Sequence, residues 1–188
     1  MKIRTIALLG ALTTMVSAVS ANAAVTVITG GEAEACYQAA EEQWDPDTSI
    51  PICNFALNGF LSPRDRAATL VNRGILKLAK VDGAGSLADF DKGLQIDANI
   101  AEGYVDRGAS LIILQRFPEA IVDINKGIAM NTDKLAAAYF DRGMANDRLG
   151  NLVAAYHDYK QSQLIDPFFD PPTKALQGMT LVVKPAGS

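Results

Sequence analysis

The chain has 188 residues, of which 17 are Lys or Arg and 21 are Asp or Glu, so its net charge is −4. This acidic balance argues against nucleic acid as a partner, because phosphate recognition needs clustered Lys and Arg. It also argues against electrostatic attachment to an anionic membrane.

The first 23 residues have the pattern of a cleaved export signal. Lys2 and Arg4 precede an apolar stretch over 6–19, and segment 21–23 supplies the small residues that a signal peptidase reads. The apolar stretch is short for a membrane span, and no second one follows. We therefore expect an exported protein, periplasmic or secreted, that is not inserted in the membrane after cleavage. Without Lys2 and Arg4, 15 basic side chains face 21 acidic ones, a net charge of −6.

Residues 24–66 are expected to form an N-terminal helical hairpin, with helices over 31–42 and 48–58. Each helix carries one of the two cysteines, Cys36 and Cys53. An oxidising compartment favours a disulfide between them, worth about 3 kcal/mol for a loop of this length. Two free buried thiols are the alternative. A metal site is not indicated, because CxxC spacing and partner histidines are absent.

Three similar units of about 34 residues follow in segment 67–169. They cover 67–100, 101–134 and 136–169, with one inserted residue before the third. Apolar residues recur at intervals of three and four, which predicts two helices in each unit, over unit positions 2–14 and 18–30. The first helix of the first unit is expected to begin near Ser62 and Pro63, which suit a helix N-terminus.

Small and large side chains alternate at fixed unit positions. Position 8 is Gly in every unit, positions 20 and 27 are small, and positions 4 and 24 are mostly large. Two helices approach closely only where neither carries bulk. We therefore expect the helices to cross at the small residues, with the large residues filling the space beside the crossing.

This pattern is similar to that of the tetratricopeptide repeat family, whose unit has 34 residues and the same code of small and large positions. The third unit agrees best, and the first departs most, with Lys77 at a usually apolar position. The resemblance implies an all-α protein: an α-solenoid of about three helix-turn-helix repeats after a degenerate N-terminal hairpin. It also implies an exported bacterial member of this group, without naming a partner.

Charged residues repeat as well. Position 7, usually apolar in the family, is Arg in every unit, and position 23 is always Asp. An Arg in a helix interface needs an acceptor. We therefore expect a ladder of Arg–Asp pairs that links the helices of each unit, or one unit to the next; independent solvated charges are the alternative. The six residues are Arg73, Asp89, Arg107, Asp123, Arg142 and Asp158.

The resemblance further implies a binding groove, because the first helix of each unit lines the concave face through positions 2, 5, 9, 12 and 13. An apolar groove suits an amphipathic helix or an extended peptide. Some family members clamp a terminal carboxylate with Lys and Asn at positions 5 and 9, which are apolar here. The chain's own segment 181–183, or a second copy, could fill the groove instead. The expected groove residues are Val71, Ile75, Leu78, Val105, Ala109, Ile112, Phe140 and Met144.

No catalytic, cofactor or metal site is indicated. His157 is the sole histidine, and no nucleophile–base set or phosphate-binding loop is recognisable. Segment 170–188 is expected to cap the stack or form a tail, with a helical turn at 173–177. The expected function is a non-catalytic adaptor or scaffold for a protein or peptide; self-assembly into a homodimer, through the groove or a stack end, is the alternative.

Overall fold

The computed structural model describes residues 31–177 and 179. The expected export signal and segment 181–183 lie outside these residues. All regular structure in the described part is helical. No helix there combines the length and the apolar character that crossing a membrane requires.

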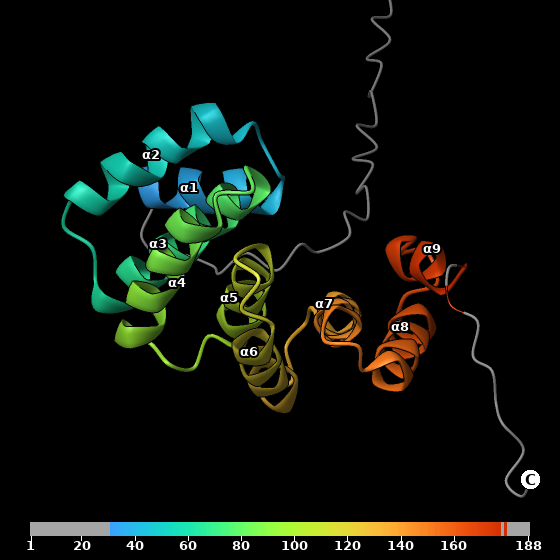
Figure 1. Cartoon of the computed structure of the whole chain (residues 1–188). Helices are drawn as coiled ribbons and strands as arrows, with labels where there is room; N and C mark the ends of the chain where they lie inside the picture. Colours follow the sequence, from blue (N-terminus) through green and yellow to red (C-terminus); the bar gives the residue numbers. More distant parts are fainter. Residues whose placement is uncertain (1–30, 178, 180–188) are drawn as a thin grey trace, which may run out of the picture.

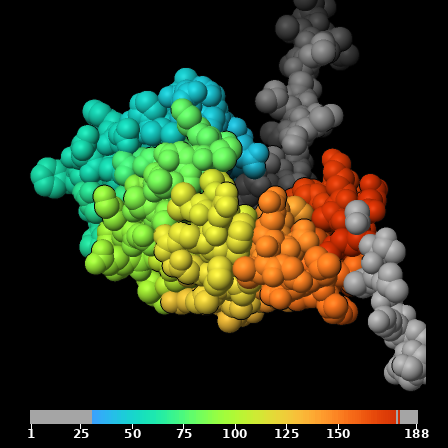
Figure 2. All heavy atoms as spheres, viewed as in Figure 1, coloured from blue at the N-terminus to red at the C-terminus, as the bar shows by residue number. Residues whose placement is uncertain are grey.

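The helices follow one another across the molecule in chain order (Figure 1), and successive units lie side by side (Figure 2). Each odd-numbered helix from α1 to α7 pairs most extensively with the helix that follows it. The helices are α1 Glu32–Glu41, α2 Pro46–Asn58, α3 Pro63–Ala79, α4 Gly83–Ile96, α5 Ala101–Ile113, α6 Phe117–Ala129, α7 Leu135–Arg148, α8 Leu152–Ile165 and α9 Pro171–Gln177.

The repeat helices agree with the predicted bounds to within a residue or two, apart from the early start of α3. That helix begins at Pro63, as its N-terminal residues predict, and Ser62 Oγ accepts a hydrogen bond from the Asp65 amide at 3.1 Å. The start of α2 was predicted two residues late. Asp45 caps this helix and Pro46 occupies its first turn, so both belong to the helix start rather than to a separate turn.

Every unit turns between its two helices through a left-handed residue at unit position 15. The φ angles are 60° at Val81, 59° at Gln115 and 80° at Gly150. Only the third unit places glycine there, the residue that adopts this conformation without steric cost. The turn geometry is therefore imposed by the helix packing in the first two units.

The helices of a unit cross at the glycine of position 8, as expected. A Cβ on Gly108 would lie 2.5 Å from Ile124, and Gly74 and Gly143 face Phe90 and Tyr159 in the same way. One detail of the prediction was wrong. The large residue at position 24 packs directly onto the glycine and not beside the crossing, so the glycine provides the room for that side chain.

The N-terminal hairpin is joined by a disulfide between Cys36 and Cys53. Both cysteines are buried, and Leu76 of α3 belongs to the same apolar cluster. Both α1 and α2 contact α3. The hairpin thus covers the outer end of the first repeat.

The other end of the stack is covered by α9, as the prediction for 173–177 stated. Pro172 is buried, and Gln163 of α8 donates a hydrogen bond to Thr173 Oγ1 at 3.0 Å. The last repeat helix, α8, ends at Ile165, which is unit position 30 as predicted, and Pro171 begins α9.

The two sides of the stack differ. The first helices of successive units touch, α3 with α5 and α5 with α7, whereas α4, α6 and α8 make no comparable contacts with one another. The stack is therefore closed along its first helices and open along its second helices. This curvature places α3, α5 and α7 on the concave, inner side.

Candidate functional site: the ladder and the inner face

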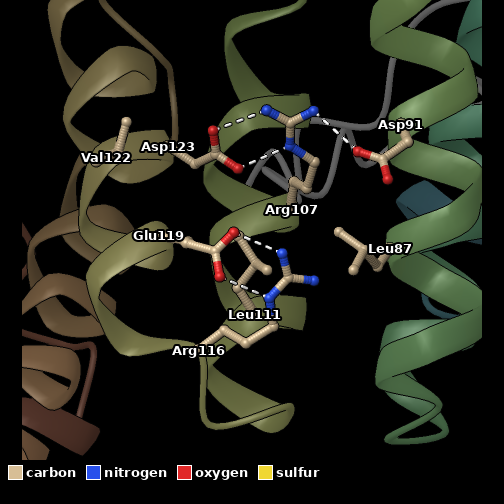
Figure 3. Close-up of a pocket in the computed structure, with 8 residues that line it drawn as sticks. All are labelled: Leu87, Asp91, Arg107, Leu111, Arg116, Glu119, Val122 and Asp123. Carbon is tan, nitrogen blue, oxygen red and sulfur yellow. Dashed lines mark hydrogen bonds and ion pairs between the residues drawn. The ribbon is translucent and has the colours of Figure 1, made fainter.

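The Arg–Asp ladder is present in all three units. Arg107 Nε donates to Asp123 Oδ2 at 2.7 Å and its Nη2 donates to Oδ1 at 2.8 Å, a bidentate pair visible in Figure 3. Arg73 pairs with Asp89, and Arg142 with Asp158, through the same atoms. The solvated alternative is thereby excluded for these six residues.

Each arginine also reaches the preceding unit with its remaining nitrogen, Nη1. The acceptors lie on the second helix of that unit: Asn54 at 2.7 Å for Arg73, Asp91 at 3.0 Å for Arg107, and Asn125 at 2.7 Å for Arg142. The sequence left open whether the ladder joins helices within a unit or joins successive units. It does both.

The Arg–Asp ladder stabilises the structure through charge compensation. The hydrogen bond that Arg107 donates to Asp123 raises the pKa of Arg107, and the one that Arg142 donates to Asp158 raises the pKa of Arg142, while burial opposes both shifts. The aspartates are almost fully buried, so each depends on its arginine for compensation.

Two of the predicted groove residues are not on the surface. Val71 and Val105, both at position 5, are 0% and 1% exposed. Each points at the glycine of position 27 in its own unit, Gly93 or Gly127. Because glycine leaves room there, the valine packs into the unit, so assigning these two residues to the groove was wrong.

Phe140, at position 5 of the third unit, is half-buried for a different reason. Position 27 is Ser162 here, whose Oγ donates to the Ala136 carbonyl at 2.6 Å. The Phe140 ring instead packs against Tyr159 and Phe169, with both centroid separations 5.6 Å. Phe140 therefore joins α7 to α8 and to the segment that follows α8.

The remaining predicted groove residues, Ile75, Leu78, Ala109, Ile112 and Met144, are half-buried. Of these, the structure brings Ile112 and Met144 together in one cleft of about 390 Å³ between the C-terminal ends of α5 and α7, which we call the inner cleft. It is lined by Ile112, Ile113, Gln115, Phe117, Met144 and Arg148. Gln115 comes from the turn after α5 and Phe117 is the first residue of α6; neither was among the predicted groove residues.

Acidic residues at position 6 form a second feature that the sequence analysis did not assign. Lys134 Nζ lies 2.7 Å from Asp106 Oδ2. Burial raises the pKa of Asp141 to about 7; the charge of Asp106 adds to the rise, and Lys134 opposes it. The spacing of 35 residues between Asp106 and Asp141 could have signalled this pairing, since equivalent positions of neighbouring first helices lie close together.

The described part of the chain contains no group of three or more His, Cys, Asp or Glu residues that could hold a metal ion. His157 is exposed on α8, with its ring 6.0 Å from that of Tyr156.

No family model matches this chain, and no curated protein matches it. Solved structures do match this chain. The Arabidopsis OM64 TPR domain is 18% identical, with a TM-score of 0.58 over 62% of this chain and 95% of that domain. A MamA chain from residue 41 to the end, from Desulfovibrio magneticus RS-1, is 18% identical, with a TM-score of 0.62 over 78% of this chain and 82% of that chain.

The second TPR domain of human RPAP3, solved in complex with the HSP70 peptide SGPTIEEVD, is 22% identical. Its TM-score is 0.55, over 62% of this chain and 96% of that domain. Likeness at these identities establishes the fold. The chain is an all-α solenoid with the tetratricopeptide repeat fold, as the sequence pattern predicts.

Proposed function

We propose that the protein is a non-catalytic adaptor or scaffold that binds a peptide or protein segment in the inner cleft. The observation that carries the proposal is the cleft itself. Four apolar side chains from helices α5, α6 and α7 of two repeats converge on one recess, with Gln115 and Arg148 beside them. Exposed apolar surface of this kind is typical of protein interaction sites.

The chemistry of the inner cleft indicates the kind of segment it holds. Ile112, Ile113, Phe117 and Met144 suit aliphatic or aromatic side chains, and methionine adapts its shape to different partners. Arg148 supplies a positive charge for a carboxylate. The expected ligand is an amphipathic helix or extended peptide with apolar anchors and an acidic residue next to them.

The similar fold of the RPAP3 domain, which holds a peptide, supports peptide binding as the general mode. The terminal-carboxylate clamp is not part of the proposal. Positions 5 and 9 of this chain carry apolar residues, and two of those at position 5, Val71 and Val105, are buried.

We also propose that the protein acts after export, in the periplasm or as a secreted protein. Support comes from the signal-like pattern of residues 1–23 and from the paired cysteines of the hairpin. Fractionation of producing cells, with N-terminal sequencing of the mature chain, tests this; a cytoplasmic protein that retains its first 23 residues would contradict it.

Affinity capture from exported proteins tests the inner cleft. Met144→Glu places a charge among its apolar side chains, and Leu149→Glu is the matched control, because Leu149 is 42% exposed and lies outside the cleft lining. Proteins captured by the wild type and by the control variant should be lost from Met144→Glu. Equal capture by all three folded proteins would overturn the proposal.

Self-assembly remains the second candidate, because α8 exposes Leu152 and Val153 at the C-terminal end of the stack. One feature opposes continuation of the stack there. Unit position 25, which supplies the acceptor for the next arginine as Asp91 and Asn125 do, is Lys160 in the last unit. Light scattering at several concentrations distinguishes the two candidates: a concentration-dependent dimer would favour self-assembly.

A further inference from the structure

The three ladder units differ at unit position 11, which faces the ladder aspartate. In the first unit Lys77 Nζ lies 2.7 Å from Asp89 Oδ2 and 3.4 Å from the Gly85 carbonyl oxygen. In the third unit Asn146 Nδ2 donates to Asp158 Oδ2 at 3.2 Å. These two aspartates therefore have a second side-chain donor in addition to their arginine.

The second unit has Leu111 at this position, and leucine has no donor. Asp123 accepts from Arg107 through both oxygens, but nothing at position 11 corresponds to Lys77 or Asn146. A carboxylate oxygen has two lone pairs. Asp89 Oδ2 uses both, because it accepts from Arg73 Nε and Lys77 Nζ together.

Leu111 lies beneath a cleft of about 340 Å³, which we call the outer cleft. It opens between α4 and α6 over α5, on the side where the second helices are separated (Figure 3). It is therefore distinct from the inner cleft. Its lining residues are Leu87, Asp91, Arg107, Leu111, Arg116, Glu119, Val122 and Asp123.

The outer cleft combines an apolar surface with an excess of negative charge. Three carboxylates face two guanidinium groups, since Arg107 contacts Asp123 and Asp91 while Arg116 forms a separate pair with Glu119. Leu87, Leu111 and Val122 supply the apolar part. This arrangement suits a side chain with an aliphatic stem and a single positive charge.

We propose that the outer cleft binds a lysine side chain of a partner protein. The ammonium group is held by Asp123 Oδ2 and the Glu119 carbonyl oxygen, the atoms equivalent to those that hold Lys77 in the first unit. The methylene groups lie against Leu111 and its apolar neighbours. The partner thus supplies the donor that the first unit carries in its own chain.

The geometry favours lysine over arginine. Arg107 already contacts both oxygens of Asp123 in a bidentate pair. A second guanidinium group therefore finds no free edge of this carboxylate for a bidentate contact of its own. An ammonium group needs only a single lone pair and is compact. The first unit shows that this combination of arginine and lysine on one aspartate fits the fold.

The test uses the mature chain with labelled Leu and Val methyl groups and a pentapeptide probe, Ala-Ala-Lys-Ala-Ala, followed by NMR. We expect saturable shifts of the Leu87 and Val122 methyl signals. Peptides with norleucine or acetyl-lysine in place of lysine should bind at least about tenfold more weakly, the effect of losing one charge-assisted contact. Equal binding of the norleucine peptide, or no response to the lysine peptide, would overturn the proposal.

Leu111→Lys copies the first unit and should abolish peptide binding by filling the site from within, while Leu111→Met should retain it. If Leu111→Lys fails to fold, Val122→Arg is used in its place to test peptide binding. Val122 is 68% exposed, so its replacement adds a repelling charge at the cleft with little effect on packing. Val153→Arg, at an exposed site on α8, is the matched control. Undiminished binding by folded Leu111→Lys or by Val122→Arg would contradict the lysine site.

Discussion

At the scale of single residues, the glycine of position 8 is required by the side chain that faces it. Gly108→Ala would gain about 1 kcal/mol of helix propensity. The new Cβ would lie 2.5 Å from Ile124 Cγ1 and 3.2 Å from the Ala120 carbonyl oxygen, and overpacking of this kind costs about 1–3 kcal/mol. We expect a net loss of about 1 kcal/mol in the free energy of unfolding, the difference between a cost of about 2 kcal/mol in the middle of this range and the gain in helix propensity, measured by urea denaturation.

The control for this prediction trims the opposing side chain. Ile124→Val should cost less in the Gly108→Ala background than in the wild type, because it removes Cδ1, which would lie 3.1 Å from the new Cβ, and leaves a shorter side chain at the crossing. A Gly108→Ala protein at least as stable as the wild type would show that the crossing does not depend on glycine.

Asp141 makes stability depend on pH. Its pKa is raised to about 7 in the folded protein, against about 3.9 in an unfolded chain. Between these values the folded state binds the proton of Asp141 more tightly, so the contribution of Asp141 to stability is greatest below about pH 4 and falls as pH rises to about 7. Asp141→Asn removes this fall and should stabilise the protein by about 1–3 kcal/mol at pH 8, with little effect at pH 4.

Thermal unfolding from pH 4 to pH 8 checks this. Asp147→Asn, on the exposed surface of the same helix, should leave the pH dependence nearly unchanged. An equal gain for Asp141→Asn at both ends of the range would contradict the assignment.

At the scale of helices and repeats, the ladder joins the units to one another. Arg142→Ala removes the bidentate contact with Asp158 and the contact with Asn125 on α6. We expect a loss of about 2 kcal/mol in the free energy of unfolding, because a nearly buried carboxylate loses its compensating charge. Asn125→Ala removes only the contact between units and should cost about 1 kcal/mol.

Chemical denaturation compares these variants with Arg148→Ala, an exposed arginine on the same helix that should change stability by less than about 0.5 kcal/mol. If Arg142→Ala were equally harmless, the ladder would not be a source of stability.

The sequence predicted helices, turns and ladder pairs because these features repeat. Three copies of one pattern fix the helix bounds, and repeated Arg and Asp imply repeated contacts. Val71 and Val105 were wrongly assigned to the groove, because their burial depends on the residue at position 27. Glycine at position 27 leaves room for the valine side chain. Position 5, which lies on the surface in the family, is therefore part of the core in these two units.

The two clefts could not be predicted in full, because their walls come from different units. The outer cleft requires α4 and α6 to separate over α5, which is a property of the stack and not of any one helix. Its sequence signal is the change from Lys77 to Leu111 at position 11. That change indicates a missing donor only once the contact of Lys77 with Asp89 is known.

At the scale of the whole molecule, the stack is asymmetric from end to end. A disulfide-linked hairpin covers the first repeat, and α9 covers the last. Terminal units of a solenoid lack one neighbour and need such covering. The second unit contributes to both the inner and the outer cleft, so it is the centre of the proposed interactions.

Site-specific photo-crosslinking tests the central claim, that a partner binds in the inner cleft, most directly. Benzoylphenylalanine is placed at position 144, inside the cleft, or at position 149, outside its lining, in the exported protein within producing cells. We predict discrete crosslinked species from position 144 that are absent from position 149. Irradiated protein that yields no crosslink from position 144, or the same products from both positions, would contradict the account.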